Sequence, residues 1–154
     1  MKLTENFWLQ EFEKSQTATR LGIDNSIPNI LIPQIKALAI NVLQPVRNQF
    51  GPTTVTSGYR SPELNRAIGG SHRSQHVKGL AADFEVPGES NFVVAKWIQD
   101  NLVFDQLILE GHKKFVPNSG WVHCSYNSVG VNRQQALTAY FSGGRVKYVT
   151  GLEE

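Results

Sequence analysis

The amino-acid sequence predicts an α+β fold. Segments with a helical spacing of apolar residues dominate the first 50 residues, whereas most short runs typical of strands come after residue 53. Helices that come first and strands that cluster later favour α+β over a repeated βαβ array. The chain has 154 residues, 40% of them hydrophobic, which suits a single domain over residues 1–154 with one core.

The N-terminal region is expected to hold one or two short helices. Residues 3–22 combine helix-forming residues with several aromatic ones, and Gly22 can end the last turn. Residues 23–29 contain Asp, Asn, Ser and Pro, so we expect a loop there.

The main core helix is predicted over residues 30–50. Apolar residues recur in it at three- and four-residue steps, which places them on one face. Pro33 fits a first turn, but Pro45 is expected to kink the last turns because it lacks an N–H group. Gly51 and Pro52 should end the helix.

A strand, a short helix and a loop follow. Residues 53–57 are rich in β-branched side chains and predict a strand. Residues 61–68 predict a short helix, with Ser61 as its N-cap and Pro62 in its first position. The glycines at 69 and 70 should then release the chain into a loop that carries His72 and His76.

The rest of the chain alternates strands with one more helix. We expect strands over residues 80–86, 104–110 and 121–126, and a helix over residues 90–101. Two strand-like runs around Ser-Gly-Gly predict a C-terminal hairpin over residues 136–150.

Composition excludes several classes of function. The net charge of +2 and the lack of any basic block argue against a nucleic-acid partner. No apolar run is long enough to insert in a membrane, and the N-terminus has no apolar signal segment, so synthesis in the cytoplasm without a signal peptide is expected. The single Cys124 cannot form an internal disulfide. We expect a monomer.

Two histidines and one aspartate have the character of a metal-ligand set. Asp83 lies in an otherwise apolar run, where an unpaired carboxylate would be costly. Gly79 allows a tight turn, so that His76 can fold back towards Asp83. Strand alternation places His123 on the face opposite Cys124, which should point into the core. Two imidazoles and one carboxylate are the protein ligands of a catalytic zinc, which keeps one position open for water.

Each of these residues has an ordinary structural explanation when it is taken alone. A single histidine in a strand is usually a hydrogen-bonded core residue, and a single aspartate is usually a cap or turn residue. Their combination at this spacing favours the metal site.

Several motifs resemble those of a known peptidase family. Residues 74–83 fit the S-x-H-x-x-G-x-A-x-D signature of the M15 zinc peptidases, the group of D-Ala-D-Ala carboxypeptidases and murein endopeptidases. Residues 57–62, Ser-Gly-Tyr-Arg-Ser-Pro, and residues 121–125, Trp-Val-His-Cys-Ser, are similar to two further elements of that family. The similarity covers roughly residues 11–126 and is closest to small phage-type members. It implies a hedgehog-like zinc fold, in which an antiparallel sheet is packed with helices.

The resemblance implies roles for individual residues. His76, Asp83 and His123 would bind Zn²⁺. Arg60 would bind the substrate carboxylate or the developing oxyanion, although a surface arginine beside a turn is the alternative. Ser74 would lie near the substrate, or would simply cap a loop.

The general base has two candidates. Some family branches carry an acid three residues before the last histidine, but that position is Gly120 here. Glu110 resembles the glutamate that other branches carry at the end of the preceding strand, although residues 111–120 make the intervening gap long. Glu85 competes, because it shares a strand face with Asp83.

The remaining candidates concern the surroundings of the site. Tyr59, Trp121 and Tyr126 either line a substrate groove or belong to the core. His72 is expected at the rim of the pocket or on the surface. His112, in the long loop, is expected to be solvent-exposed unless the loop acts as a lid.

The resemblance therefore predicts a zinc-dependent peptidase that cleaves peptidoglycan stem peptides with metal-activated water, as a carboxypeptidase or an endopeptidase. Such an enzyme would act on the cell wall after release from the cell, or from a phage particle. The alternative function is a zinc-stabilised binding module of the same fold that has lost catalysis. A glutamate that faces the open metal position would favour the enzyme.

Overall fold

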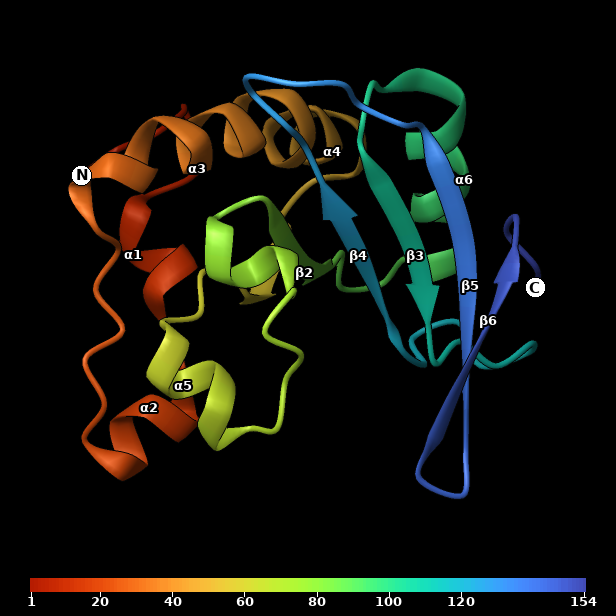
Figure 1. The fold of residues 1–154 in the computed structure, drawn as a ribbon. Helices are drawn as coiled ribbons and strands as arrows, with labels where there is room; N and C mark the ends of the chain where they lie inside the picture. Colours follow the sequence, from red (N-terminus) through yellow and green to blue (C-terminus); the bar gives the residue numbers. More distant parts are fainter.

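A six-stranded mixed sheet forms the centre of the fold, and the computed structural model describes all of residues 1–154 (Figure 1). The order of strands across the sheet is β1-β2-β4-β3-β5-β6. The strands are β1 (Thr54–Ser57), β2 (Ala81–Glu85), β3 (Gln106–Glu110), β4 (Trp121–Ser125), β5 (Gln135–Ser142) and β6 (Arg145–Thr150). The predicted α+β class is confirmed at this level.

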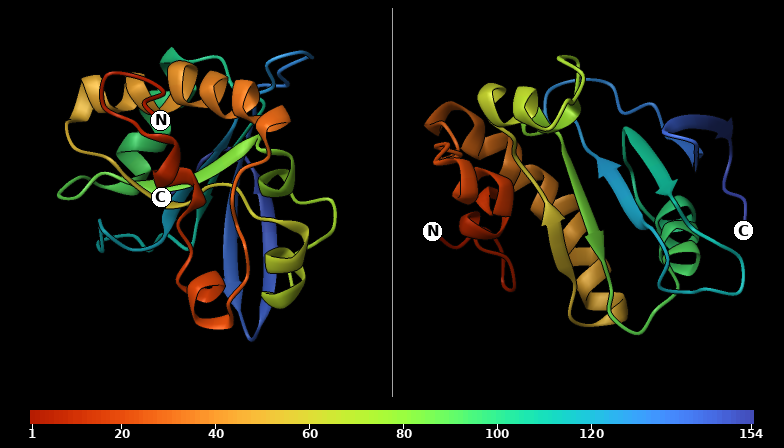
Figure 2. Two further views of the ribbon diagram at one scale, coloured as in Figure 1. Left: turned by 90° about the vertical axis from the view of Figure 1, so that its left-hand side faces the viewer. Right: turned by 90° about the horizontal axis from the view of Figure 1, so that it is seen from below.

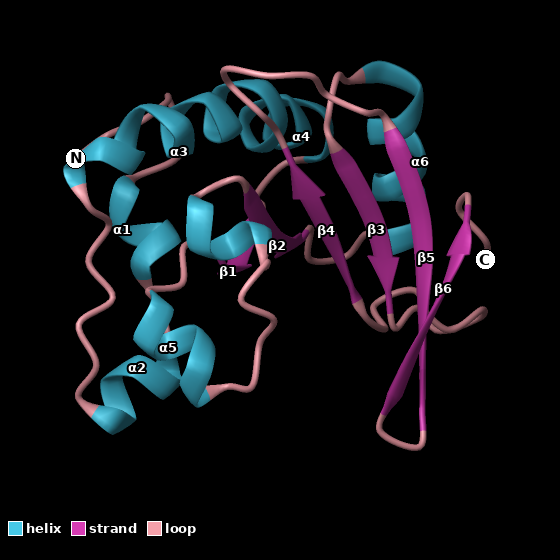
Figure 3. Ribbon diagram, in the orientation of Figure 1, coloured by secondary structure: helices cyan, strands magenta, loops and turns pink.

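The helices also lie close to their predicted positions (Figure 3). Gly22 ends the second helix in the left-handed conformation, and the hydroxyl of Ser61 accepts a hydrogen bond from the N–H of Leu64, as expected for an N-cap. The helices are α1 (Leu9–Glu13), α2 (Gln16–Leu21), α3 (Ile32–Leu38), α4 (Gln44–Phe50), α5 (Pro62–Ala67) and α6 (Asn91–Asn101), with 3₁₀ turns η1 (Asn29–Leu31) and η3 (Gln75–Lys78) and the π-helical turn η2 (Ala39–Leu43). None of them is both long and apolar enough to cross a membrane.

The long helical segment accommodates Pro45 differently from the predicted kink. The π-helical turn η2 joins α3 to α4, and Pro45 lies in the first turn of α4. Proline has no N–H group and its ring crowds the carbonyl four residues earlier, which here belongs to Asn41. A wider turn directly before the proline relieves this crowding, so the segment stays helical from residue 32 to residue 50.

The prediction of a fully antiparallel sheet is wrong at one interface, because β3 and β5 are parallel. Strand β4 runs antiparallel to β3, so β4 ends beside the first residues of β3. Residues 126–134 then pass over this end of β3, and β5 starts on its other side, with Gln135 beside Gln106. Because β5 begins where β3 begins, the two strands must run in the same direction.

The two faces of the sheet have different environments. Phe84, Val122 and Cys124 point into a cluster of 24 buried hydrophobic residues that also includes residues of α3, η2, α4 and α6. Figure 2 shows these helices on one side of the strands. Cys124 is completely buried, and burial raises the pKa of its thiol, which disfavours the thiolate that a metal would need. The alternate residues Asp83 and His123 point to the opposite face, as predicted.

Candidate metal centre

The side chains of His76, Asp83 and His123 meet on the uncovered face of the sheet. Asp83 of β2 and His123 of β4 are direct partners across the strand pair, which places them side by side. His76 lies in the 3₁₀ turn η3, not in an open loop as expected. Gly79 ends this turn with φ 69°, in the left-handed conformation, and turns the chain back into β2.

The three side chains are close enough to hold one ion. One nitrogen or oxygen atom from each lies within 4.8 Å of the other two. Asp83 Oδ1 is 3.0 Å from His123 Nδ1 and 3.4 Å from His76 Nε2. All three residues are buried, with side-chain exposures of 10% or less. The donor set and its spacing therefore fit a divalent ion that is bound by two imidazoles and one carboxylate.

The electrostatics of the cluster suit a cation. Burial by itself would raise the pKa of Asp83, but hydrogen bonds and charge from His123 and His76 outweigh it and hold the pKa far below its ordinary value. Asp83 is thus an ionised carboxylate in a buried position. Arg60 also lies beside this carboxylate, with its Nη2 3.6 Å from Asp83 Oδ2.

Hydrogen bonds on the outer side of the cluster orient both imidazoles. His76 Nδ1 lies 2.7 Å from the carbonyl oxygen of Gly58, so it must donate there, which leaves Nε2 free as a ligand atom. His123 Nε2 lies 3.1 Å from Gln75 Oε1, which leaves Nδ1 facing Asp83. Gly58 can support His76 only because it is a glycine, since a Cβ atom would lie 2.7 Å from the backbone of Phe12.

A second layer of hydrogen bonds holds Gln75, and nothing in the sequence pattern pointed to it. Gln75 Nε2 donates to Asp105 Oδ2 at 3.0 Å. Asp105 is itself held by Arg133, whose Nε and Nη2 donate to its two carboxylate oxygens at 2.9 Å each. These contacts with Arg133 lower the pKa of Asp105. Arg133 lies 50 residues from Asp83 in the sequence, so only the crossing segment 126–134 brings it here.

We expect Gln75→Leu to weaken metal binding about 10- to 100-fold while the protein stays folded. Leucine has a similar size but offers no acceptor to His123 Nε2, so the ring loses its fixed tautomer and orientation. Competition titration with a zinc chelator measures the affinity. Asp100→Asn is the control, because the Lys96–Asp100 ion pair is exposed and distant from the cluster. Equal affinities for a folded Gln75→Leu variant and the wild type would contradict this role.

Glu110 lies on the same face at the end of β3. It pairs directly with Trp121, two residues before His123 on the neighbouring strand, and it lines the same cleft as the three ligands. Burial raises the pKa of Glu110; the charge of His123 opposes this rise and that of Asp83 adds to it. Trp121 Nε1 donates a hydrogen bond to Glu110 Oε2 at 3.1 Å, which fixes the carboxylate. A half-buried, oriented carboxylate of this kind is suited to accept a proton.

The long connection between β3 and β4 does not displace Glu110, since the strands keep their register up to the pair Glu110–Trp121. Gly120 closes this connection with φ 70°, and a Cβ atom there would lie 2.0 Å from the carbonyl oxygen of Glu110. No acidic side chain fits at position 120. The other base candidate, Glu85, does not line the cleft and belongs to a separate cavity near residues 86–91.

The predicted exposure of His112 is wrong. Its side chain is buried and its ring stacks on Phe92 of α6, with 6.4 Å between ring centroids. The connection folds back over α6 because Asn91 donates two hydrogen bonds to the carbonyl oxygens of Ser119 and Gly120. His112 is therefore packed on the side of the molecule away from the cleft. His72 is exposed, as expected.

The cleft above the ligands has a volume of about 310 Å³. It brings together most of the predicted substrate residues, and its lining consists of Arg60, Ser71, Arg73, Ser74, Gln75, His76, Asp83, Gln106, Ile108, Glu110, Trp121, His123 and Tyr148. The hydroxyl of Ser74 accepts a hydrogen bond from the N–H of His76 at 3.3 Å, so Ser74 also caps η3.

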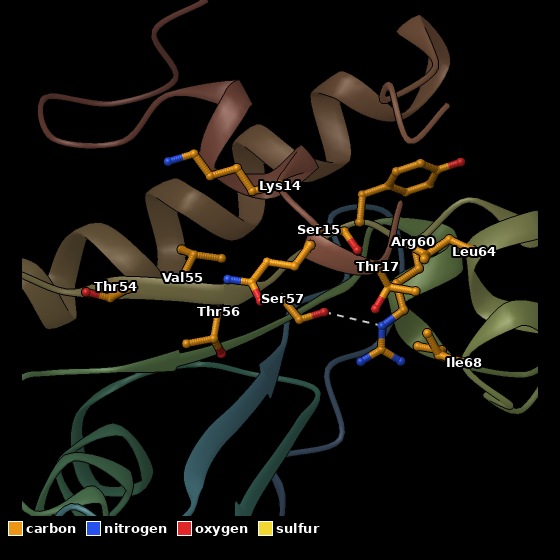
Figure 4. A pocket seen from close by; sticks show the side chains of 12 residues that line it. Lys14, Ser15, Thr17, Thr54, Val55, Thr56, Ser57, Arg60, Leu64 and Ile68 are labelled. Carbon is orange, nitrogen blue, oxygen red and sulfur yellow. Dashed lines mark hydrogen bonds between the residues drawn. The ribbon is translucent and has the colours of Figure 1, made fainter. Parts of the chain in front are cut away.

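Arg60 forms one wall of this cleft. Its Nε donates to Ser57 Oγ at 3.3 Å (Figure 4). Its Nη2 lies 3.6 Å from Asp83 Oδ2. A second cavity of about 560 Å³ lies on the other side of Arg60, between β1, α2 and α5. Tyr59 borders that cavity, not the cleft, and its side chain is part of the hydrophobic core. Tyr126 also packs against the core. Of the three aromatic candidates, only Trp121 lies in the cleft.

Comparison with known proteins identifies the family. The family model described as peptidase M15 matches residues 5–125, which include all three candidate ligands and Glu110. A stretch of 61 residues, 40% of this chain, is 39% identical to the subtilisin-like protease SBT1.5 of Arabidopsis thaliana. That match spans only 8% of the plant protein. The match to the family model covers most of the chain, and the protein belongs to the peptidase M15 family.

Proposed function

We propose that the protein is a Zn²⁺-dependent peptidase that hydrolyses peptide bonds in the stem peptides of peptidoglycan. The observation that carries the proposal is the approach of His76, Asp83 and His123 to within 4.8 Å of one another beside the half-buried Glu110. Membership of a peptidase family supports hydrolysis of a peptide bond. The choice of zinc rests on the donor set, because two imidazoles and one carboxylate are typical of catalytic zinc sites.

The mechanism follows from the positions of the side chains. His76, Asp83 and His123 would hold the ion, which would supply a Lewis acid and would lower the pKa of a water at the open position to ~7. Glu110 is placed to take a proton from the attacking water and later to deliver it to the leaving amine. Trp121 occupies one oxygen of that carboxylate and leaves the other free for proton transfer. Arg60, on the opposite wall, would stabilise negative charge on the substrate.

The bond that is cleaved depends on what Arg60 contacts. A carboxypeptidase needs a cation at the terminal carboxylate, and the guanidinium of Arg60 at the cleft wall supplies one. An endopeptidase needs space on both sides of the scissile bond, and the cavity of about 560 Å³ beyond Arg60 offers such space. Both modes are compatible with the proposal, and product analysis separates them. Either enzyme would act on the cell wall after release from the cell or from a phage particle.

A zinc-stabilised binding module is the alternative function. Such a module would not need a carboxylate beside the open coordination position of the metal. The half-buried position of Glu110 in the cleft, fixed by Trp121, supports the enzyme over the module.

Digestion of purified murein tests the proposal. We expect release of soluble amino acids or peptides in the presence of Zn²⁺, none in the presence of a chelator, and recovery when Zn²⁺ is added back. Mass analysis of defined stem peptides then shows whether a terminal residue or an internal bond is cut. If the metal-loaded protein binds murein but releases nothing, the binding module is the correct function. If it neither binds nor cleaves murein, the proposed substrate is wrong.

A further inference from the structure

The C-terminal hairpin β5–β6 contributes to the cleft, although it lies outside the residues that match the family model, 5–125. Its contribution is Tyr148 of β6, which lines the cleft together with the three metal ligands and Glu110. The family motifs gave no indication of this residue, because it follows the last of them, at His123, by 25 positions; the sequence predicted only that it lies in a hairpin.

The register of the sheet explains why Tyr148 faces the cleft. Glu110 pairs with Ala139 across β3 and β5, and Ala139 pairs with Tyr148 across β5 and β6. Residues that are direct partners in a sheet point to the same face, so Trp121, Glu110, Ala139 and Tyr148 form one row across four strands. The Cα atoms of Glu110 and Tyr148 are thus two strand spacings apart, about 10 Å.

The residue between them is small. Ala139 is buried beneath its neighbours and offers only a methyl group on this face. The phenol ring of Tyr148 can therefore lie across β5 towards Glu110 without a larger side chain in between. Burial raises the pKa of Tyr148, and the charge of Glu110 adds to this rise, which is consistent with their closeness.

The surroundings of Tyr148 resemble a binding surface more than a packed interior. The residue is 54% exposed, and no hydrogen bond from the protein acts on its hydroxyl. The same face of the hairpin carries the exposed Phe141 and Val146, and the ring of Phe141 packs on Trp121 with 5.7 Å between centroids. Aromatic side chains with a free polar end are common where a protein contacts a ligand.

We propose that Tyr148 is a substrate-binding residue whose ring packs on the peptide and whose hydroxyl donates a hydrogen bond to one of its carbonyl oxygens. Arg60 and Tyr148 then bound the cleft at opposite ends, one near β1 and the other on β6, with the metal ligands and Glu110 between them. The peptide lies across the strands, and the hairpin binds the part of it beyond Glu110. This inference rests on the proposed peptidase function.

Steady-state kinetics on a defined stem peptide test the inference, with two variants of Tyr148. We expect Tyr148→Phe to raise KM about 3- to 10-fold with little change in kcat, because it removes one neutral hydrogen bond from the bound peptide. Tyr148→Ala should raise KM further, because it also removes the contact of the ring. Zinc affinity should be unchanged in both variants, since Tyr148 touches no metal ligand.

Tyr140→Phe is the matched control. Tyr140 lies on the same hairpin but on the opposite face, where its hydroxyl donates a hydrogen bond to Glu153. The Tyr140→Phe substitution should therefore leave kcat and KM unchanged. Thermal unfolding of all variants checks the fold. If Tyr148→Phe and Tyr148→Ala both keep the KM of the wild type, or if Tyr140→Phe raises KM as much as they do, the inference is wrong while the peptidase function stands. A wild-type protein without turnover on any stem peptide would overturn both.

Discussion

Asp83→Ala is expected to lose metal binding and to lower kcat/KM at least about 10³-fold. Asp83 is the only anionic member of the cluster, and its oxygen lies within 3.4 Å of both histidine rings. Without it, two neutral imidazoles would have to hold the ion with no charge compensation. An ion in such a site contributes several kcal/mol to transition-state stabilisation, which corresponds to the expected loss of rate.

Metal content by elemental analysis, measured on protein that was dialysed after loading, checks the expectation directly. Cys124→Ser is a suitable control, because its thiol is buried on the opposite face of β4 and should not contribute to binding. A folded Asp83→Ala protein that retains one equivalent of zinc would show that the ion is bound elsewhere. A Cys124→Ser protein that loses the metal would show that the thiol is a ligand after all.

Glu110→Gln is expected to retain zinc but to lower kcat about 10²- to 10⁴-fold, the usual contribution of a general base. Glutamine keeps the size of the side chain and can still accept the hydrogen bond from Trp121 Nε1. What it loses is the ability to take up a proton. Glu85→Gln, which removes a carboxylate from the same face of β2 but outside the cleft, serves as the control.

The same substitution should stabilise the metal-free protein at neutral pH. The folded pKa of Glu110 is raised by burial, so the fold favours the protonated form, and its charged form costs stability as the pH rises above the unfolded pKa. A neutral glutamine removes this cost near pH 7 and changes little near pH 3. Denaturant unfolding at the two pH values measures the difference. Unchanged turnover of the Glu110→Gln variant would exclude Glu110 as the general base. A lower stability of the variant at neutral pH would show that burial of the charged carboxylate does not destabilise the wild-type fold.

Local sequence signals gave a good account of the secondary structure. The sequence predicted the helix caps at Ser61 and Gly22, because a cap depends on a few neighbouring residues. It also predicted that Asp83 and His123 point to the face opposite the core, because side chains alternate along a strand. Where the structure differs from the prediction, the cause lies far away in the sequence. Strand β5 is parallel to β3 because β4 ends beside the start of β3. His112 is buried because Asn91 of α6 holds the end of the connection between β3 and β4.

The sequence by itself determined the family, and the types and order of the candidate metal ligands, because the signature at residues 74–83 and the later Trp-Val-His motif are local patterns. Only the tertiary structure decided which side chains surround those ligands. Gln75, Asp105 and Arg133 form one chain of hydrogen bonds, and Tyr148 reaches the cleft through two strand pairings. Such contacts join residues tens of positions apart, and their partners are fixed by sheet register and by one crossing connection, which no short segment of sequence encodes.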